Sequence, residues 1–362
     1  MPRYTLTISP DYVKDWSVSD AIRELIQNAI DQESLDNTNT KTIEVVNDSI
    51  LIANKNSVLE KSTLLLGGGT KDGSSTIGVF GEGYKIALLV LLREGYDVEI
   101  RNYKAGELWI PKIVNSRIYN SQVLAIDTME YKFETIPDNS LEIIINRMDC
   151  YTATDLISEV WLDYNSDYES VRSGKADILL DESLKGNIYV RGLKITHNDS
   201  LHYGYNFDVN VLKLGRDRNI VSGYDLQTEL GHVWGNIDSE YTHLVLKMFE
   251  EKAYDVAYLS EWKMQTPIKE AIVEAYKDKT VITYESDKDK LRDTFGEVKD
   301  AVIVPEAIRD VVYCNHSRNT GVRIEKKSTR DLFNEFLEKY EDYINTLDSD
   351  FCEELEDLIN LT

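Results

Sequence analysis

The chain has 362 residues, which at roughly 150 residues per domain predicts two or three domains with hydrophobic cores of their own. Forty Lys and Arg residues against 64 Asp and Glu residues give a formal net charge of −24, and this excludes a histone-like or polybasic membrane-surface role. Three scattered cysteines, Cys150, Cys314 and Cys352, provide neither a disulfide framework nor a zinc-ligand pattern, so we expect a reducing compartment.

The N-terminal segment lacks the basic and then apolar pattern of a signal peptide. No apolar run reaches the roughly 18 residues that a membrane-spanning helix requires. We therefore expect a soluble, cytoplasmic protein that does not enter a membrane.

The first 150 residues combine helical periodicity with strand-like runs of β-branched residues. The elements expected here, in chain order, are an extended segment at 4–8, a helix at about 19–35, a hairpin at 42–53, an apolar helix at about 84–93 and four strands between 96 and 148. A glycine- and serine-rich stretch at 67–75 precedes the second helix. Helices beside an antiparallel meander predict a two-layer α+β domain over residues 1–150.

Two further regions follow that domain. Residues 151–245 predict an α/β module with a helix, a strand pair at 186–197 and a further helical stretch. Residues 246–362 predict a helix-rich α/β region with a small crossover pattern, in which a helix at 288–296 lies between strands at 280–286 and 301–306. The last segment, 331–362, is an amphipathic helix pattern with eleven acidic residues against one lysine. We favour a solvated acidic face packed on its own core over a partner-binding helix.

A polar stripe runs along the first predicted helix. Glu24, Asn28 and Asp31 stand at positions i, i+4 and i+7, which project from one narrow face at 3.6 residues per turn. A purely structural helix can also present such a stripe to solvent, so the stripe by itself does not establish a site.

A glycine motif, Gly78-x-x-Gly81-x-Gly83, leads directly into the second helix. Bare backbone N–H groups at a helix N-terminus favour an anion, so this segment predicts a phosphate cradle. The alternative is a glycine-rich surface turn. The glycine order differs from the dinucleotide-binding fingerprint and from the P-loop, so the common nucleotide-binding folds are disfavoured.

Together, the two motifs resemble those of the GHKL ATPase superfamily, which includes gyrase, the large heat-shock chaperone, histidine kinases, MutL and MORC proteins. The family's helix carries Glu-x-x-x-Asn-Ala-x-Asp, and its lid carries Gly-x-x-Gly-x-Gly before an apolar helix. Both occur here in that order with a hairpin between them. The resemblance covers about residues 10–150 and implies a Bergerat nucleotide fold that binds ATP and Mg²⁺.

The resemblance also implies the roles of individual residues around the phosphates. They are Glu24 as the general base, Asn28 as the Mg²⁺ ligand, Asp31 as a residue that holds the helix to the site, and Gly78, Gly81, Gly83 and Lys85 as phosphate-binding groups. A positioned base, a metal and donors for developing charge are what phosphoryl transfer to water requires.

The family's second motif, Asp-x-Gly-x-Gly, falls at residues 54–58, where both glycines are absent. Asn54 replaces the aspartate that accepts a hydrogen bond from adenine, and an amide oxygen is still an acceptor. Asn56 tolerates a positive φ better than most residues, so the turn is expected to survive. Ser140 keeps the hydroxyl of the family's Gly-Thr pair. Adenine specificity therefore stays open.

Residues 151–245 resemble in general terms the transducer domains that send a basic residue to the γ-phosphate. The candidates here are Lys213, Arg216 and Arg218, a basic cluster in an acidic protein. A solvated loop or a structural ion-pair site is the competing interpretation.

We therefore expect an ATPase that closes a glycine-rich lid over Mg-ATP and couples hydrolysis to movement of the C-terminal modules. The resemblance also implies a homodimer, because members of this family commonly dimerise. A protein that binds nucleotide without hydrolysing it, and engages or inhibits a partner protein through its acidic surface, is the alternative. An ATP-driven DNA clamp or a histidine kinase is less favoured, and no helix before residue 10 offers a phosphoacceptor histidine. The charge favours a protein partner over nucleic acid.

Overall fold

The computed structural model describes residues 2–36, 38–65, 82–134, 137–164, 167–215, 222–287 and 301–319. These residues form a mixed α+β protein, as predicted. The chain divides into two compact units, and the division falls after Gln265. The domain boundaries predicted at residues 150 and 245 stay predictions. The described part of the chain contains no helix with the length and apolar character needed to cross a bilayer.

The first sheet has seven strands in the order β1-β6-β5-β4-β7-β3-β2. Every neighbouring pair in it is antiparallel. The predicted hairpin is confirmed, with Ile43 paired to Ile52. The strands are β1 (Arg3–Thr5), β2 (Lys41–Val45), β3 (Ser49–Lys55), β4 (Asp97–Asn102), β5 (Glu107–Ser116), β6 (Ser121–Glu130) and β7 (Asn139–Asn146).

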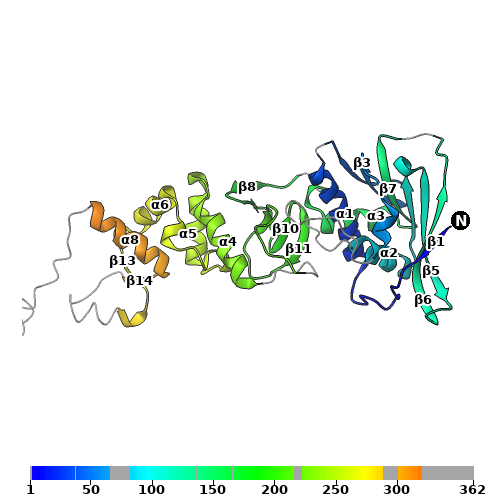
Figure 1. Ribbon diagram of the computed structural model, residues 1–362. Coiled ribbons are helices and arrows are strands. Elements are labelled where there is room, and N and C mark those ends of the chain that lie inside the picture. Colours follow the sequence, from blue (N-terminus) through cyan, green and yellow to red (C-terminus); the bar gives the residue numbers. More distant parts are fainter. Residues whose placement is uncertain are drawn as a thin grey trace, which may run out of the picture. The chain divides into compact units, whose positions relative to one another are not determined.

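Three helices, α1 (Val18–Leu35), α2 (Gly83–Arg93) and α3 (Cys150–Val160), gather on one face of this sheet (Figure 1). Helix α1 begins at a capping box in which Ser17 and Asp20 satisfy each other's backbone N–H groups. Helix α2 is buried from Tyr84 to Leu91, because it packs against α1 beside it and against strands β4 and β5 of the sheet, as the apolar run predicts. The helices therefore hold the first sheet in a two-layer arrangement.

The second sheet belongs to the same compact unit and has the order β11-β10-β12-β9-β8. Strands β10 and β12 are parallel, and the other described pairs are antiparallel. The predicted strand pair at 186–197 is confirmed as β10 and β11. Its elements are β8 (Ser170–Ser173), β9 (Ala176–Leu179), β10 (Asn187–Val190), β11 (Leu193–His197) and β12 (Gly204–Phe207), followed by α4 (Gly223–Gly235) and α5 (Thr242–Glu250).

The second compact unit begins with α6 (Thr266–Tyr276) and contains the parallel pair β13 (Thr280–Ile282) and β14 (Ala301–Ile303), then α8 (Glu306–Asn319). The parallel pairing of β13 and β14 is the part of the predicted crossover pattern that the described residues contain. The predicted helix near 288–296 and the acidic segment 331–362 lie outside the described residues. Short 3-10 turns link the larger elements: η1 (Lys61–Leu64), η2 (Tyr103–Ala105), η3 (Leu162–Tyr164), η4 (Glu182–Leu184), η5 (Ser239–Tyr241), η6 (Tyr254–Val256) and η7 (Glu261–Lys263).

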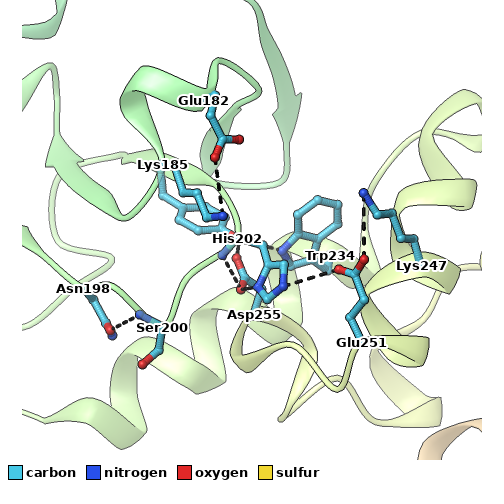
Figure 2. Close-up of polar contacts among 10 residues, drawn as sticks. Glu182, Lys185, Asn198, Ser200, His202, Trp234, Lys247, Glu251 and Asp255 are labelled. Atoms are coloured by element: carbon cyan, nitrogen blue, oxygen red, sulfur yellow. Dashed lines mark hydrogen bonds and ion pairs between the residues drawn. The ribbon is translucent and has the colours of Figure 1, made fainter.

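Hydrogen bonds to the buried carboxylate of Asp255, in η6, link strand β12 of the second sheet to helix α4. Asp255 is fully buried, and its carboxylate accepts hydrogen bonds from the Tyr205 hydroxyl and from the His202 backbone N–H at 2.9 Å. Trp234 Nε1 donates to the Tyr205 oxygen at 2.9 Å, and Figure 2 shows His202, Asp255 and Trp234 side by side. Burial, followed by the charge of Asp255, holds the pKa of Tyr205 well above its usual range, so the phenol stays a donor.

Tyr205→Phe is expected to lower the free energy of unfolding by about 2 kcal/mol, because it leaves the buried Asp255 oxygen and the Trp234 N–H without a partner. Tyr203→Phe is the matched control, since the Tyr203 ring packs against the same tryptophan at 5.3 Å. Urea unfolding of both variants measures the difference. Equal midpoints for the two variants would contradict this account.

Candidate functional site

The Glu24 side chain lies against the first residue of α2. Glu24 is 1 % exposed, and a Cβ atom placed on Gly83 would stand 2.0 Å from Glu24 Oε2. Only a residue without a side chain leaves room for the carboxylate at this point. The structure thus brings together one residue from each of the two sequence motifs.

The polar stripe of α1 faces the protein more than solvent. Glu24 and Asp31 are buried and Asn28 is half-buried, which disfavours the interpretation of a solvated stripe. Asn28 Nδ2 donates to the backbone oxygen of Glu24 at 2.7 Å. This bond directs the amide nitrogen along the helix, so the amide oxygen is the atom directed away from the backbone.

A β-bulge marks the site edge of the sheet. Asn54 pairs with Leu141 and Lys55 pairs with Asn139, which leaves Ser140 as the extra residue on β7. The Ser140 hydroxyl donates to the backbone oxygen of Ser57 at 2.6 Å. Asn54 and Ser140, the two residues expected near adenine, therefore lie at neighbouring strand ends.

Asn54 also contacts α1 directly. It is buried, and its Nδ2 donates to the backbone oxygen of Ala29 and to Asn39 Oδ1, each at 3.0 Å. Asn39 and Ser57 were not expected from the sequence, because a loop asparagine and a serine carry no motif of their own. The Asn56 turn does form as predicted, with φ at 62°.

The Lys85 side chain bonds to backbone at the end of η1. Its ammonium donates to the oxygens of Thr63 at 2.8 Å and Leu65 at 2.6 Å. The residue is fully buried, and burial lowers the pKa of its ammonium group. Tyr84 joins the same contact through a hydrogen bond to the Thr63 oxygen at 3.0 Å. Lys85 therefore links the start of α2 to the carbonyl oxygens of residues 63 and 65. A contact of Lys85 with phosphate stays a prediction.

Several predicted site residues lie outside the described part of the chain: Gly78, Gly81, Arg216, Arg218 and the glycine-rich stretch 67–75. Lys213 is described and is exposed to solvent. No contact between Lys213 and the residues around Glu24 follows from the described structure, so its approach to phosphate stays a prediction.

The described residues contain no cluster of three or more His, Cys, Asp or Glu side chains suited to a metal ion. The Asn28 amide oxygen is nevertheless a donor of the type that Mg²⁺ accepts. Mg²⁺ in nucleotide sites is commonly held by one or two protein oxygens together with substrate phosphates and waters. The donor set therefore fits a metal that arrives with a phosphorylated ligand.

No family model matches the chain. An uncharacterized protein of Mycoplasma pneumoniae is 25% identical to it over 211 residues, which cover 57% of this chain and 84% of that protein. The aligned stretch is longer than the predicted 150-residue N-terminal domain, so the similarity extends beyond it.

Proposed function

We propose that this protein is a Mg-ATP-binding ATPase of the GHKL type that couples nucleotide binding and hydrolysis to a conformational change acting on a partner protein. The single observation that carries the proposal is the approach of the Glu24 carboxylate to Gly83 at the start of α2. A carboxylate base beside a glycine at a helix N-terminus is an arrangement suited to attack of water on a bound phosphate.

The surrounding residues support a nucleotide in an extended pose. Asn28 lies one turn after Glu24 on α1, where its amide oxygen would hold Mg²⁺. Asn54 donates a hydrogen bond to Ala29 in α1 and lies beside the Ser140 bulge. This position is suited to the adenine ring of the nucleotide. The residues proposed to bind the phosphates and the residue proposed to bind adenine are thus both positioned by α1.

The chemistry needs few protein groups. Glu24 accepts a proton from the attacking water, and the backbone N–H at Gly83 donates to phosphate oxygen. Mg²⁺, when bound, would neutralise charge on the phosphates. The seven-stranded antiparallel sheet with three helices on one face supports a Bergerat-type domain as the frame of this site.

Isothermal titration with Mg-ATP and a phosphate-release assay test the proposal. Wild-type protein should bind ATP in a Mg²⁺-dependent way and release phosphate. Asn28→Ala should weaken the Mg²⁺-dependent binding by at least about 10- to 100-fold, because it removes the metal's protein oxygen. Asn146→Ala is a control on a distant strand end. Binding of ATP without phosphate release would favour a nucleotide-gated binding protein, and no binding would reject the proposal.

A further inference from the structure

Three exposed aromatic rings lie together where the chain after η6 packs on helix α4. Tyr224, Tyr258 and Trp262 are 62, 41 and 70 % exposed. The rings of Tyr224 and Tyr258 meet edge to face, with their centroids 5.4 Å apart. Lys263 connects this pair to Trp262, because its ammonium donates to the Tyr258 backbone oxygen at 3.1 Å and lies 5.3 Å from the centre of the Trp262 ring. We call Tyr224, Tyr258 and Trp262 the aromatic patch.

The backbone beneath the aromatic patch is held close to two glycines of α4. A Cβ atom on Gly231 would stand 2.5 Å from the Tyr258 backbone oxygen, and one on Gly235 would stand 2.3 Å from the Lys263 backbone oxygen. Only glycine permits this approach at either position. The chain is thus fixed on both sides of Trp262, so a partner that binds the ring has little additional chain to order.

Trp262 differs from the other four tryptophans of the chain in its exposure. Trp109 and Trp234 are fully buried, and Trp16 and Trp161 are half-buried. A large aromatic side chain that is both exposed and held in place is typical of the residues that contribute most to binding at protein interfaces. The aromatic patch is therefore a candidate surface for a partner.

The charge around the aromatic patch is negative. Residues 222–264 contain eight acidic side chains, three lysines and no arginine. Asp225 and Glu261 are each adjacent in sequence to a residue of the patch, and Glu229 lies near enough to act on the charge of Lys263. A wholly apolar partner would desolvate such carboxylates without pairing them, and a nucleic acid would be repelled by them.

We propose that the aromatic patch binds an arginine-containing segment of a partner protein, with a guanidinium group stacked on Trp262. The guanidinium is a cation that is planar and weakly hydrated, so it stacks on an aromatic ring with a smaller loss of hydration than an ammonium group. Its N–H groups also donate to carboxylates such as those beside the patch. The inference rests on the proposed function only for the existence of a partner protein, because the patch shares no residue with the site around Glu24.

Calorimetric titration of the full chain with two synthetic peptides, in the absence of nucleotide, gives the first test. One peptide alternates arginine with glycine, and the other has lysine in place of each arginine, so the two carry the same charge. The arginine peptide should bind at least about fivefold more tightly and should shield tryptophan fluorescence from acrylamide quenching. Equal affinity for the two peptides, or no binding of either, would overturn the inference, whereas phosphate release from ATP stays a separate test of the proposed function.

Trp262→Ala removes the ring at the centre of the proposed contact. It should weaken binding of the arginine peptide about tenfold and abolish the preference over the lysine peptide, whereas Trp262→Phe should keep part of that preference because a ring remains. Tyr151→Ala is the matched control, since it removes a ring that is 81 % exposed at the start of α3, and it should leave binding unchanged. Thermal unfolding shows whether each variant is folded.

Two other occupants of the aromatic patch are distinguished by the same variant. Sedimentation without peptide detects self-association, and titration with duplex DNA detects binding of nucleic acid. Loss of either property in Trp262→Ala would assign the patch to a second copy of the chain or to nucleic acid and would reject the inference. Unchanged affinity of folded Trp262→Ala for the arginine peptide would reject it as well.

Discussion

Glu24→Gln is expected to reduce the rate of ATP hydrolysis by about 100- to 10,000-fold, the range of general-base contributions. The substitution keeps the volume of a side chain that is 1 % exposed, so the packing of α1 on α2 should persist. Mg-ATP affinity should stay within about twofold, because the base acts on water and makes its contribution in the transition state. Single-turnover phosphate release and calorimetric titration measure the two quantities separately.

The control for this prediction is Glu33→Gln, which also removes a carboxylate from α1. Glu33 pairs with Lys41 at 2.6 Å, and its loss should cost no more than about 1 kcal/mol of stability and leave hydrolysis unchanged. Hydrolysis at the wild-type rate by Glu24→Gln would reject Glu24 as the base. A parallel loss of ATP binding would instead assign Glu24 to the binding of nucleotide.

Gly83→Ala is expected to lower kcat about 100-fold while leaving the fold intact. The new Cβ would stand 2.0 Å from Glu24 Oε2, so the carboxylate at the end of the Glu24 side chain must move away. A displacement of a catalytic group by about 1 Å can lower the rate about 100-fold. Alanine is a better helix former than glycine by about 1 kcal/mol, so the melting temperature should not fall. Steady-state kinetics and thermal unfolding give the two results.

The matched control is Gly223→Ala, at the first position of α4. A Cβ atom there meets only the Tyr254 hydroxyl at 3.8 Å, an ordinary contact, so activity should be preserved. If Gly83→Ala keeps full activity, the Glu24 carboxylate does not need its observed position. If it unfolds, Gly83 is a packing residue and its effect on catalysis has a different origin.

Periodicity and turn chemistry, which act locally, predict much of the first domain. The apolar run at 84–93 predicts the buried helix α2, and the paired β-branched runs at 42–53 predict the hairpin of β2 and β3. Asn56 at φ 62° follows from its tolerance of the left-handed region. The stripe of Glu24 and Asn28 follows from helical spacing. These features depend on residues a few positions apart, so the sequence contains them.

Short strands without clear alternation escaped the sequence analysis. Strands β8, β9 and β12 have four residues each and follow or precede turns that give no period to detect. Their pairing depends on neighbours far along the chain, such as the parallel contact of β10 with β12. Non-local pairing of this kind has no local signal.

The sequence by itself determined which residues stand on one face of α1 and approximately where α1, α2 and the hairpin of β2 and β3 lie, because backbone geometry converts short spacings directly into shared faces. Only the tertiary structure decided that Gly83 lies against Glu24, that Lys85 bonds to the carbonyls of residues 63 and 65, and that Asn54 donates to Asn39. Those contacts join segments 15 to 59 residues apart. Buried polar groups must form hydrogen bonds, and their partners here come from segments that meet only when the helices pack on the sheet. These contacts therefore depend on the tertiary structure of the whole domain.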